Sequence, residues 1–276
     1  MNYISRRTDL VATIALAVIV FCAGYGWAQE DAMVTFQALK PNISLHEPVL
    51  IQFVVHNGSP QKIMFDLGFN RKSNFDITVI QPDGVRINVP SLNHEGVGRR
   101  GEVSLETDQT YTQVLLLDEW YDFNKIGIYE IQIKLRGSLQ TESGTPVLTK
   151  LSTKLHIHIE PSNNQQLEQI CRELTKTALE SPAEKAMEAG EALSYIRDPI
   201  AVPFLAEVLK NSPFVKSLAI VGLTRIRDAQ SVEVLINALK SRDPELQLLI
   251  QRGLHQIENE TKDPNLKRRI ADALER

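Results

Sequence analysis

The sequence contains very little cysteine: Cys22 and Cys171 are the two in 276 residues. Cys22 falls inside an apolar N-terminal segment that we expect to be removed, so the remaining chain cannot form an internal disulfide, even in an oxidising compartment. Packing must therefore hold the fold together. Cys171 shares the helical spacing of Leu167, Leu174 and Ala178, which predicts a buried side chain in preference to a reactive thiol.

A large excess of charge of either sign is also absent. The formal net charge is -4, and the 30 basic and 34 acidic residues are spread through both halves of the chain. Binding to nucleic acid through its phosphates needs a concentrated basic surface, so we expect no nucleic-acid partner. The content of 43% hydrophobic and 23% charged residues is that of a globular protein long enough for two domains.

Familiar catalytic motifs are missing as well. The chain has no nucleophile elbow Gly-x-Ser-x-Gly, no His-Glu-x-x-His pair and no phosphate-binding loop. Each of these motifs places a nucleophile, a metal or a phosphate in a defined geometry. We therefore expect no catalytic residue, no cofactor and no metal, and we do not expect the chain to be an enzyme.

Residues 1–28 have the composition of a targeting segment. Arg6 and Arg7 precede an apolar run over residues 10–23, and Gly26-Trp27-Ala28 supplies small residues where a signal peptidase recognises them. This pattern predicts a secretory signal peptide. If residues 25–28 extend the apolar run, the segment is instead an uncleaved membrane anchor. In both cases we expect an exported protein, periplasmic or extracellular, that contacts a membrane only through this segment.

Two more specific export signals fit this segment less well. A twin-arginine signal would need an apolar residue where Asp9 stands. A lipoprotein signal ending at Cys22 would need a small residue where the bulky Phe21 stands. The signal peptide therefore remains the favoured interpretation, with the uncleaved anchor as its alternative.

Residues 30–160 alternate between apolar and polar side chains with the period of two that is typical of half-buried strands. Short strands without intervening helices predict an antiparallel, immunoglobulin-like β-sandwich, and Pro82-Asp83-Gly84 predicts a hairpin turn. The stretch 91–101, rich in glycine and charge, predicts a long mobile loop. The expected strands cover residues 34–39, 49–55, 62–65, 75–81, 85–89, 110–117, 129–135 and 148–159.

The segment 115–123, Leu-Leu-Leu-Asp-Glu-Trp-Tyr-Asp-Phe, is the most distinctive part of this domain. Its aromatic residues, with Trp120 and Tyr121 as candidate binding residues, could form a ligand shelf, and its three acids could bind calcium. The favoured alternative is that Trp120 and Phe123 close the end of the sandwich while the acids face water. Together with Gly127-x-Tyr129, the segment resembles the closing strands of immunoglobulin-like modules in secreted bacterial proteins, including the bacterial intracellular proteinase inhibitor family.

His156 and His158 lie two residues apart on an expected strand and so project from the same face, a geometry that zinc can use. Leu155, Ile157 and Ile159 take the inner face, which leaves both histidines on the outer one. Because no third ligand can be placed from the sequence, a solvated strand face is the favoured interpretation.

Residues 162–276 change to the helical period of 3.6 and contain an internal repeat. A motif of a small residue, Leu and Ile occurs three times, as Ala192-Leu193-x-x-Ile196, Gly222-Leu223-x-x-Ile226 and Gly253-Leu254-x-x-Ile257. We expect the small residue in each copy to allow close helix contact. Ser or Asp before Pro at 181, 212, 243 and 263 predicts helix N-caps, with Glu184 completing a capping box at Ser181. A fixed period of this length predicts a stacked α-solenoid whose last helix, Pro264 to Leu274, closes the array.

The motif running from Asp198 to Lys210, followed by Gly222-Leu223-x-x-Ile226, resembles the short HEAT-like repeats of phycobilisome lyases. The resemblance covers residues 165–276. It implies a curved scaffold that binds other proteins, with the second helix of each pair on the concave side. Under that mapping the concave face would be lined by Lys185, Lys216, Gln247, Gln251 and His255; an ordinary solvated surface is the alternative.

The leading hypothesis is therefore an exported, non-catalytic adaptor or scaffold. Its sandwich and its helical repeats would each offer a surface to another protein or to an envelope component. One alternative is a protease inhibitor that acts through loops of the sandwich. A second alternative, which the absence of site chemistry disfavours, is a lyase-like enzyme built on the repeats.

Overall fold

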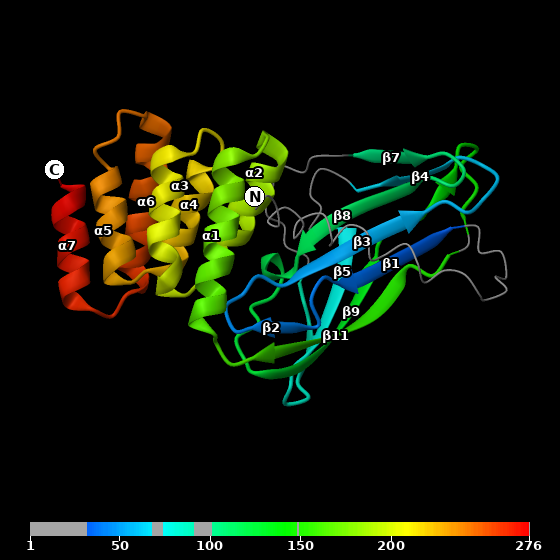
Figure 1. Ribbon diagram of the computed structural model, residues 1–276, viewed down its shortest axis with the longest axis horizontal. Helices are drawn as coiled ribbons and strands as arrows, with labels where there is room; N and C mark the ends of the chain where they lie inside the picture. Colours follow the sequence, from blue (N-terminus) through cyan, green and yellow to red (C-terminus); the bar gives the residue numbers. More distant parts are fainter. Residues whose placement is uncertain (1–31, 68–73, 91–100, 148, 276) are drawn as a thin grey trace, which may run out of the picture.

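The computed structural model describes residues 32–67, 74–90, 101–147 and 149–275. Within these ranges the chain forms a β-rich domain followed by a helical domain (Figure 1). The predicted N-terminal segment 1–28 lies outside the described residues, as does the predicted loop 91–101 except for Gly101. None of the helices within the described ranges is long and apolar enough to cross a membrane.

The described residues of the β domain form three sheets. Their strand orders are β1-β3-β8, β10-β4-β7 and β2-β11-β9-β5-β6. All neighbours pair antiparallel except β2 and β11, which are parallel. The strands are β1 Met33–Ala38, β2 Asn42–Ser44, β3 Leu50–His56, β4 Ile63–Asp66, β5 Phe75–Ile80, β6 Arg86–Asn88, β7 Glu102–Leu105, β8 Thr110–Leu116, β9 Gly127–Leu135, β10 Gln140–Thr141 and β11 Ser152–Glu160.

Alternating burial along the strands confirms the predicted sandwich. In β3, Ile51, Phe53 and Val55 are fully buried, while the residues between them are half-buried. The predicted turn at Pro82-Asp83-Gly84 is also confirmed, with Gly84 at a φ of 82° and its N–H donating to Gln81 O at 2.9 Å. Only glycine adopts that backbone conformation without strain. The sequence pattern missed β2, β7 and β10, which have two to four residues each.

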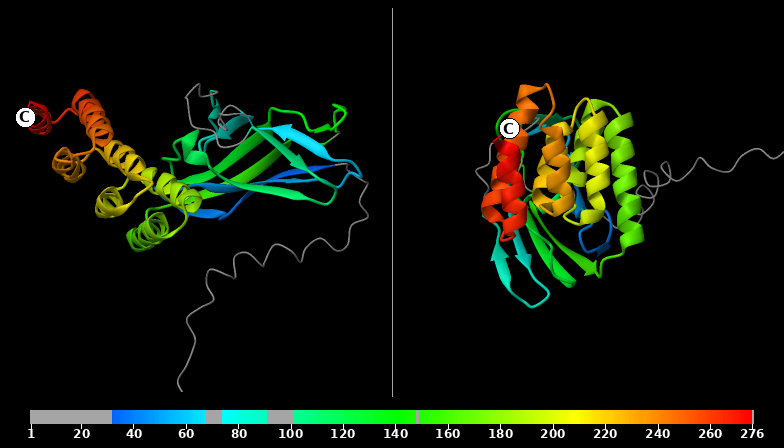
Figure 2. Two further views of the ribbon diagram at one scale, coloured as in Figure 1. Left: turned by 90° about the horizontal axis from the view of Figure 1, so that it is seen from above. Right: turned by 90° about the vertical axis from the view of Figure 1, so that its left-hand side faces the viewer.

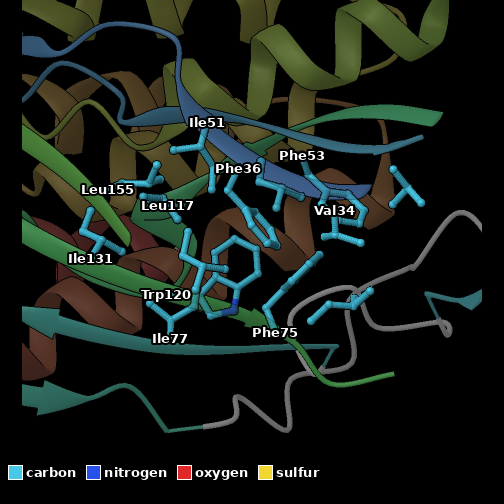
Figure 3. Close-up of a cluster of buried hydrophobic side chains, with 14 of the residues drawn as sticks. Val34, Phe36, Ile51, Phe53, Phe75, Ile77, Leu117, Trp120, Ile131 and Leu155 are labelled. Atoms are coloured by element: carbon cyan, nitrogen blue, oxygen red, sulfur yellow. The ribbon is translucent and has the colours of Figure 1, made fainter. Parts of the chain in front are cut away.

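Large aromatic side chains fill the space between the sheets (Figure 3). Phe36 on β1 stacks on Phe53 of β3 with ring centroids 5.1 Å apart, and Phe75 on β5 meets Phe53 edge to face at 5.3 Å. Trp120 reaches the same cluster and lies 6.2 Å from Phe75. Such pairs add to the stabilisation that comes from burying their apolar area.

Seven helices follow within the described residues, in two rows. Figure 2 shows one row built from α1, α3, α5 and α7 and a second built from α2, α4 and α6. This is the predicted stack of helix pairs, and α7 ends it. The helices are α1 Asn164–Glu180, α2 Ala183–Ser194, α3 Val202–Asn211, α4 Lys216–Ile226, α5 Ala229–Ala238, α6 Pro244–Glu260 and α7 Pro264–Leu274.

Two of the four predicted caps, Asp243 and Asp263, are confirmed. Ser212 is instead the C-cap of α3; its Oγ accepts the backbone N–H of Val215 at 3.1 Å, but Val215 is itself the N-cap of α4, which has no side-chain cap bond. Asp243 accepts the N–H of Glu245 at 3.0 Å, and Asp263 accepts that of Asn265 at 2.9 Å. The acidic side chains therefore satisfy N–H groups that have no partner within the helix.

The predicted cap and capping box at Ser181 and Glu184 are wrong. Ser181 ends α1, and its own N–H donates to Thr177 O at 3.1 Å. The N-cap of α2 is Pro182, which has no side-chain acceptor. With only Ser181 and Pro182 between the two helices, the serine belongs to the preceding helix and leaves α2 without a side-chain cap.

Small residues set the spacing between the helix pairs, as predicted. A Cβ on Gly222 would lie 2.9 Å from Leu205 Cδ2 and 3.0 Å from Ser194 Cα, and a Cβ on Gly253 would overlap Thr224 Oγ1. Both glycines are therefore required for neighbouring helices to pack this closely. Cys171 is fully buried within the same core, as predicted, and burial raises the pKa of its thiol to about 12.

Candidate interaction surfaces

The loop between β8 and β9 contains the aromatic residues proposed from the sequence as a ligand shelf. Trp120 and Phe123 are 7% and 6% exposed and belong to the core, as the favoured interpretation predicts. Tyr121 is half-buried, lies edge to face with Phe123 at 5.0 Å and accepts a hydrogen bond from Gln81 Nε2. These rings therefore close the end of the sandwich, and Trp120 does not form part of a ligand surface.

The expectation that the acids of this loop face water is wrong for two of the three. Asp118, in the single turn η2 Leu117–Glu119, is half-buried, and its Oδ2 accepts the backbone N–H of Val49 at 2.7 Å. Glu119 is 5% exposed, and only Asp122 is exposed. Burial raises the pKa of Asp118 to about 7, against the lowering effects of the Val49 N–H and of Arg197.

The predicted outward orientation of the two histidines is confirmed. Leu155, Ile157 and Ile159 are buried, while His156 is exposed and His158 is half-buried. His156 lies opposite Glu130 on β9, with 3.8 Å between Nε2 and Oε2. Within the described ranges, no three His, Cys, Asp or Glu side chains come together in a way that could hold a metal.

The five candidate residues on the second helices are all present on α2, α4 and α6. Lys185 is exposed on α2, and Lys216 is half-buried at the first position of α4. Gln251 and His255 are exposed on α6. Gln247 is partly buried, and its amide donates to Leu239 O at 3.1 Å, so this side chain also closes the end of α5.

Gln247, Gln251 and His255 form what we call the terminal edge of the second-helix row. Gln251 and His255 on α6 stand one repeat, 31 residues, after Ile220 and Thr224 on α4. Ile220 and Thr224 are only 2% and 9% exposed, and α4 packs against α6. The last second helix within the described residues is therefore polar where the previous one is covered. Repeat arrays are kept soluble by polar surfaces at their ends, so the terminal edge has the character of a cap.

Three large apolar side chains are exposed at or near the second helices, and the sequence analysis did not single them out. They are Phe214 just before α4, Val221 on α4 and Leu248 on α6, with exposures of 52%, 39% and 48%. Phe214 precedes Val215, the N-cap of α4, and therefore lies outside the helix. Ser217 and Val221 are four residues apart on α4 and so share a face. Leu248 on α6 stands one repeat after Ser217. We call these three residues the apolar surface set.

Among the described residues, two groups of contacts join the β-sandwich to the helices. Near β2, the N–H of Asn163 donates to Ser44 Oγ at 2.8 Å, and Gln166 Nε2 donates to Glu47 Oε2 at 2.9 Å. Glu47 is 5% exposed and also pairs with Lys40. In the second group, Arg197 between α2 and η3 Pro199–Ala201 pairs with Asp122 of the β8–β9 loop.

The pair Arg197-Asp198 recurs in the next repeat as Arg227-Asp228, so the counterpart of Arg197 is Arg227. Arg227 pairs with Glu260 at the end of α6, within the array. The first copy therefore joins the array to the sandwich, whereas the second joins neighbouring helix pairs. No local pattern in the sequence distinguishes the two arginines.

Two family models match this chain. Residues 41–160 match the model for flagellar collar protein C, N-terminal domain, and residues 186–211 match the PBS lyase HEAT-like repeat. The chain thus combines an immunoglobulin-like β-sandwich with HEAT-like repeats, as the sequence predicts. A search of curated protein sequences finds no match.

Several solved structures share similarity with about half of the chain. The CARDB domain of a Pyrococcus furiosus protein is 10% identical, with 50% of this chain and 95% of that chain covered and a TM-score of 0.26. The ApaA protein of Bordetella pertussis is 11% identical, with 46% and 91% covered and a TM-score of 0.27. A β-glucosidase of Listeria innocua is 12% identical, with 50% and 18% covered and a TM-score of 0.27.

Proposed function

We propose that this protein is an exported, non-catalytic scaffold that joins other components of a cell-envelope assembly. The observation that carries the proposal is the match of residues 41–160 to the N-terminal domain of a flagellar collar protein, directly followed by HEAT-like repeats. Repeat arrays expose long side surfaces because each unit contacts only its neighbours. A sandwich attached to such an array is suited to holding two partners at a fixed separation.

Export is the part of the proposal that rests on the sequence of residues 1–28 alone. The basic start, the apolar run and the small residues that follow support translocation out of the cytoplasm. A flagellar collar component would need the same compartment, so the family match supports this part as well.

The apolar surface set supports a protein partner for the helical domain. Phe214, Val221 and Leu248 are exposed, although their helices bury most of their other large apolar residues. Val221 and Leu248 lie on the neighbouring helices α4 and α6, and exposed apolar patches mark surfaces where proteins associate. A few anchor residues contribute most of the binding energy of such interfaces.

The test is co-sedimentation of the purified chain with the cell-envelope fraction of its native organism, with flagellar basal bodies as the first fraction examined. Wild type is expected to co-sediment. The variant Phe214→Ser, Val221→Ser, Leu248→Ser is expected to lose at least about tenfold in affinity, because anchor residues at interfaces contribute roughly 1–2 kcal/mol or more each.

A matched control places three serines on the sandwich instead, as Leu39→Ser, Val85→Ser, Ile126→Ser. These side chains are 46%, 49% and 53% exposed, so the two variants remove similar apolar surface. Full binding by the control and loss by the helical variant supports the proposal. Equal binding by all three proteins, or no binding by wild type to any envelope fraction, contradicts it.

A further inference from the structure

The β8–β9 loop connects the two groups of contacts between the domains. Asp122 of this loop holds Arg197 of the helical domain. Asp118, four residues earlier, accepts the N–H of Val49, and Val49 lies two residues after Glu47, which accepts Gln166 of α1. Asp118 is therefore hydrogen-bonded to the segment that contains Glu47 and Val49, and this segment carries the other interdomain contact.

The charges around Asp118 come from both domains. Arg197 approaches from the turn between α2 and η3, and Asp122 from the same loop; the segment before β3 contributes the backbone N–H of Val49. Arg197 is attracted by both carboxylates at once. If Asp118 takes up a proton, Arg197 keeps only Asp122, and the Val49 N–H loses a charged acceptor. Hydrogen bonds to charged acceptors are stronger than those to neutral ones.

We propose that the junction between the sandwich and the helical repeats is sensitive to protons: protonation of Asp118 loosens the contact between the two domains. The coupling is reciprocal, because Arg197 stabilises the ionised form of Asp118 and that form in turn stabilises the docking of Arg197. A scaffold with such a junction would hold its two surfaces at one angle in neutral surroundings and at a range of angles in acidic ones.

The carboxyl group of Asp118 titrates near neutral pH. Burial raises the pKa of Asp118 to about 7, from 3.8. The group is therefore largely ionised at about pH 8 and largely protonated at about pH 5.5.

The experiment measures the distance between the domains by pulsed spin-label spectroscopy in the full chain. Labels are attached at Glu142→Cys on the sandwich and Lys267→Cys on α7, both of which are exposed. Cys22→Ser removes the thiol of the N-terminal segment, and Cys171 needs no change because it is buried. The distance distribution of the otherwise wild-type chain is expected to broaden on acidification, with a midpoint near 7.

Three further variants define the cause. Asp118→Asn is expected to give the broad distribution at both pH values, as is Arg197→Gln. The matched control Arg227→Gln removes the equivalent arginine of the next repeat and is expected to keep the wild-type response. The population of separated conformations should rise about two- to fivefold, the effect expected for an exposed ion pair.

Two results would overturn the proposal. One is a wild-type distribution that is identical at both pH values, an observation that depends on no Asp118 variant. The other is an Asp118→Asn protein that still broadens on acidification, with a midpoint near about 6.5, which would assign the response to a histidine. Neither result bears on the envelope-binding experiment, so the two proposals can fail separately.

Discussion

The sandwich and the helical array fill their cores in opposite ways. In the sandwich, large rings converge from distant parts of the sequence: Phe36, Phe53, Phe75 and Trp120 meet in one cluster. In the array, adjacent helices approach through residues without bulk, above all Gly222 and Gly253. The sandwich should therefore be sensitive to the loss of side-chain volume, and the array to its gain.

The largest effect is expected from Phe53→Ala. Phe53 is fully buried and contacts the rings of Phe36, Phe75 and Tyr111. Its truncation should lower the free energy of unfolding of the sandwich by about 3–5 kcal/mol, through lost burial and a residual cavity. Trp120 lies in this core, and the only other tryptophan is Trp27. Fluorescence during urea unfolding therefore reports the sandwich.

The control for this prediction is Phe214→Ala on the helical side. Phe214 is 52% exposed, so the same substitution should change the free energy of unfolding by less than about 0.5 kcal/mol. If both variants lose equal stability, cavity formation in the sandwich is not the reason for the effect.

The second effect comes from adding one carbon to the array with Gly253→Ala. The new Cβ would overlap Thr224 Oγ1, and overpacking of this kind costs typically about 1–3 kcal/mol. Alanine on its own would favour a helix by about 1 kcal/mol, so any net loss, up to about 2 kcal/mol, is assigned to the overlap with Thr224. The measurement is urea unfolding followed by far-UV circular dichroism, which is dominated by the helices.

A double-mutant cycle tests the same contact. Thr224→Ala removes the Oγ1 that the new methyl group meets, at the expense of a hydrogen bond to Ile220 O. The double variant should regain most of the stability that Gly253→Ala loses, with a coupling of about 1–2 kcal/mol. Strict additivity of the two changes would show that the glycine is needed for some reason other than this approach.

The third effect is a pH dependence of stability that we expect for the sandwich. The pKa of Asp118 is raised in the folded state, so the folded protein binds the proton more tightly than the unfolded chain does. Stability of the sandwich should therefore increase as pH falls through about 7, by roughly 2 kcal/mol at most between about pH 8 and pH 5.5. Asp118→Asn should remove this dependence, as monitored by Trp120 fluorescence.

This stabilisation has the opposite sign to the proposed change at the junction. Protonation removes a buried charge and so favours the folded sandwich, while it weakens the attraction for Arg197 and so loosens the domains. A protein in which acidification both destabilises the sandwich and separates the domains would contradict the assignment of the two effects to Asp118.

The sequence predicts the two fold classes because both rest on local periodicity. The alternation in β3 and the recurring small residue, Leu and Ile of the helices are visible without any partner. The strands β2, β7 and β10 are too short to show a period, and they exist through the strands they pair with. Sheet order likewise depends on contacts between distant segments.

The junction could not be predicted for the same reason. Asp122 and Arg197 are 75 residues apart, and Ser44 and Asn163 are 119 apart, so nothing in the local sequence links them. Asp118 was expected in water because it is charged, but the unpaired N–H of Val49 required an acceptor. The exposed candidates on α2 and α6 follow from helical spacing alone, whereas the burial of Gln247 against the end of α5 does not.

The smallest effect concerns the helix caps, where the sequence signals at Ser181 and Asp243 appear alike but the structures differ. Asp243 accepts two backbone N–H groups at the start of α6, so Asp243→Ala should cost about 1 kcal/mol. The side chain of Ser181 makes no such bond to α2, and Ser181→Ala should change stability by no more than a few tenths of a kcal/mol.

Thermal unfolding followed by far-UV circular dichroism compares these two variants within the helical domain. An equal loss for both would restore the cap at Ser181 that the Ser-Pro pattern predicts. The expected inequality would instead show that a cap motif acts only where the chain leaves its side chain free to turn back onto the helix. That condition is met after the longer connection before α6, and it fails in the two-residue connection between α1 and α2.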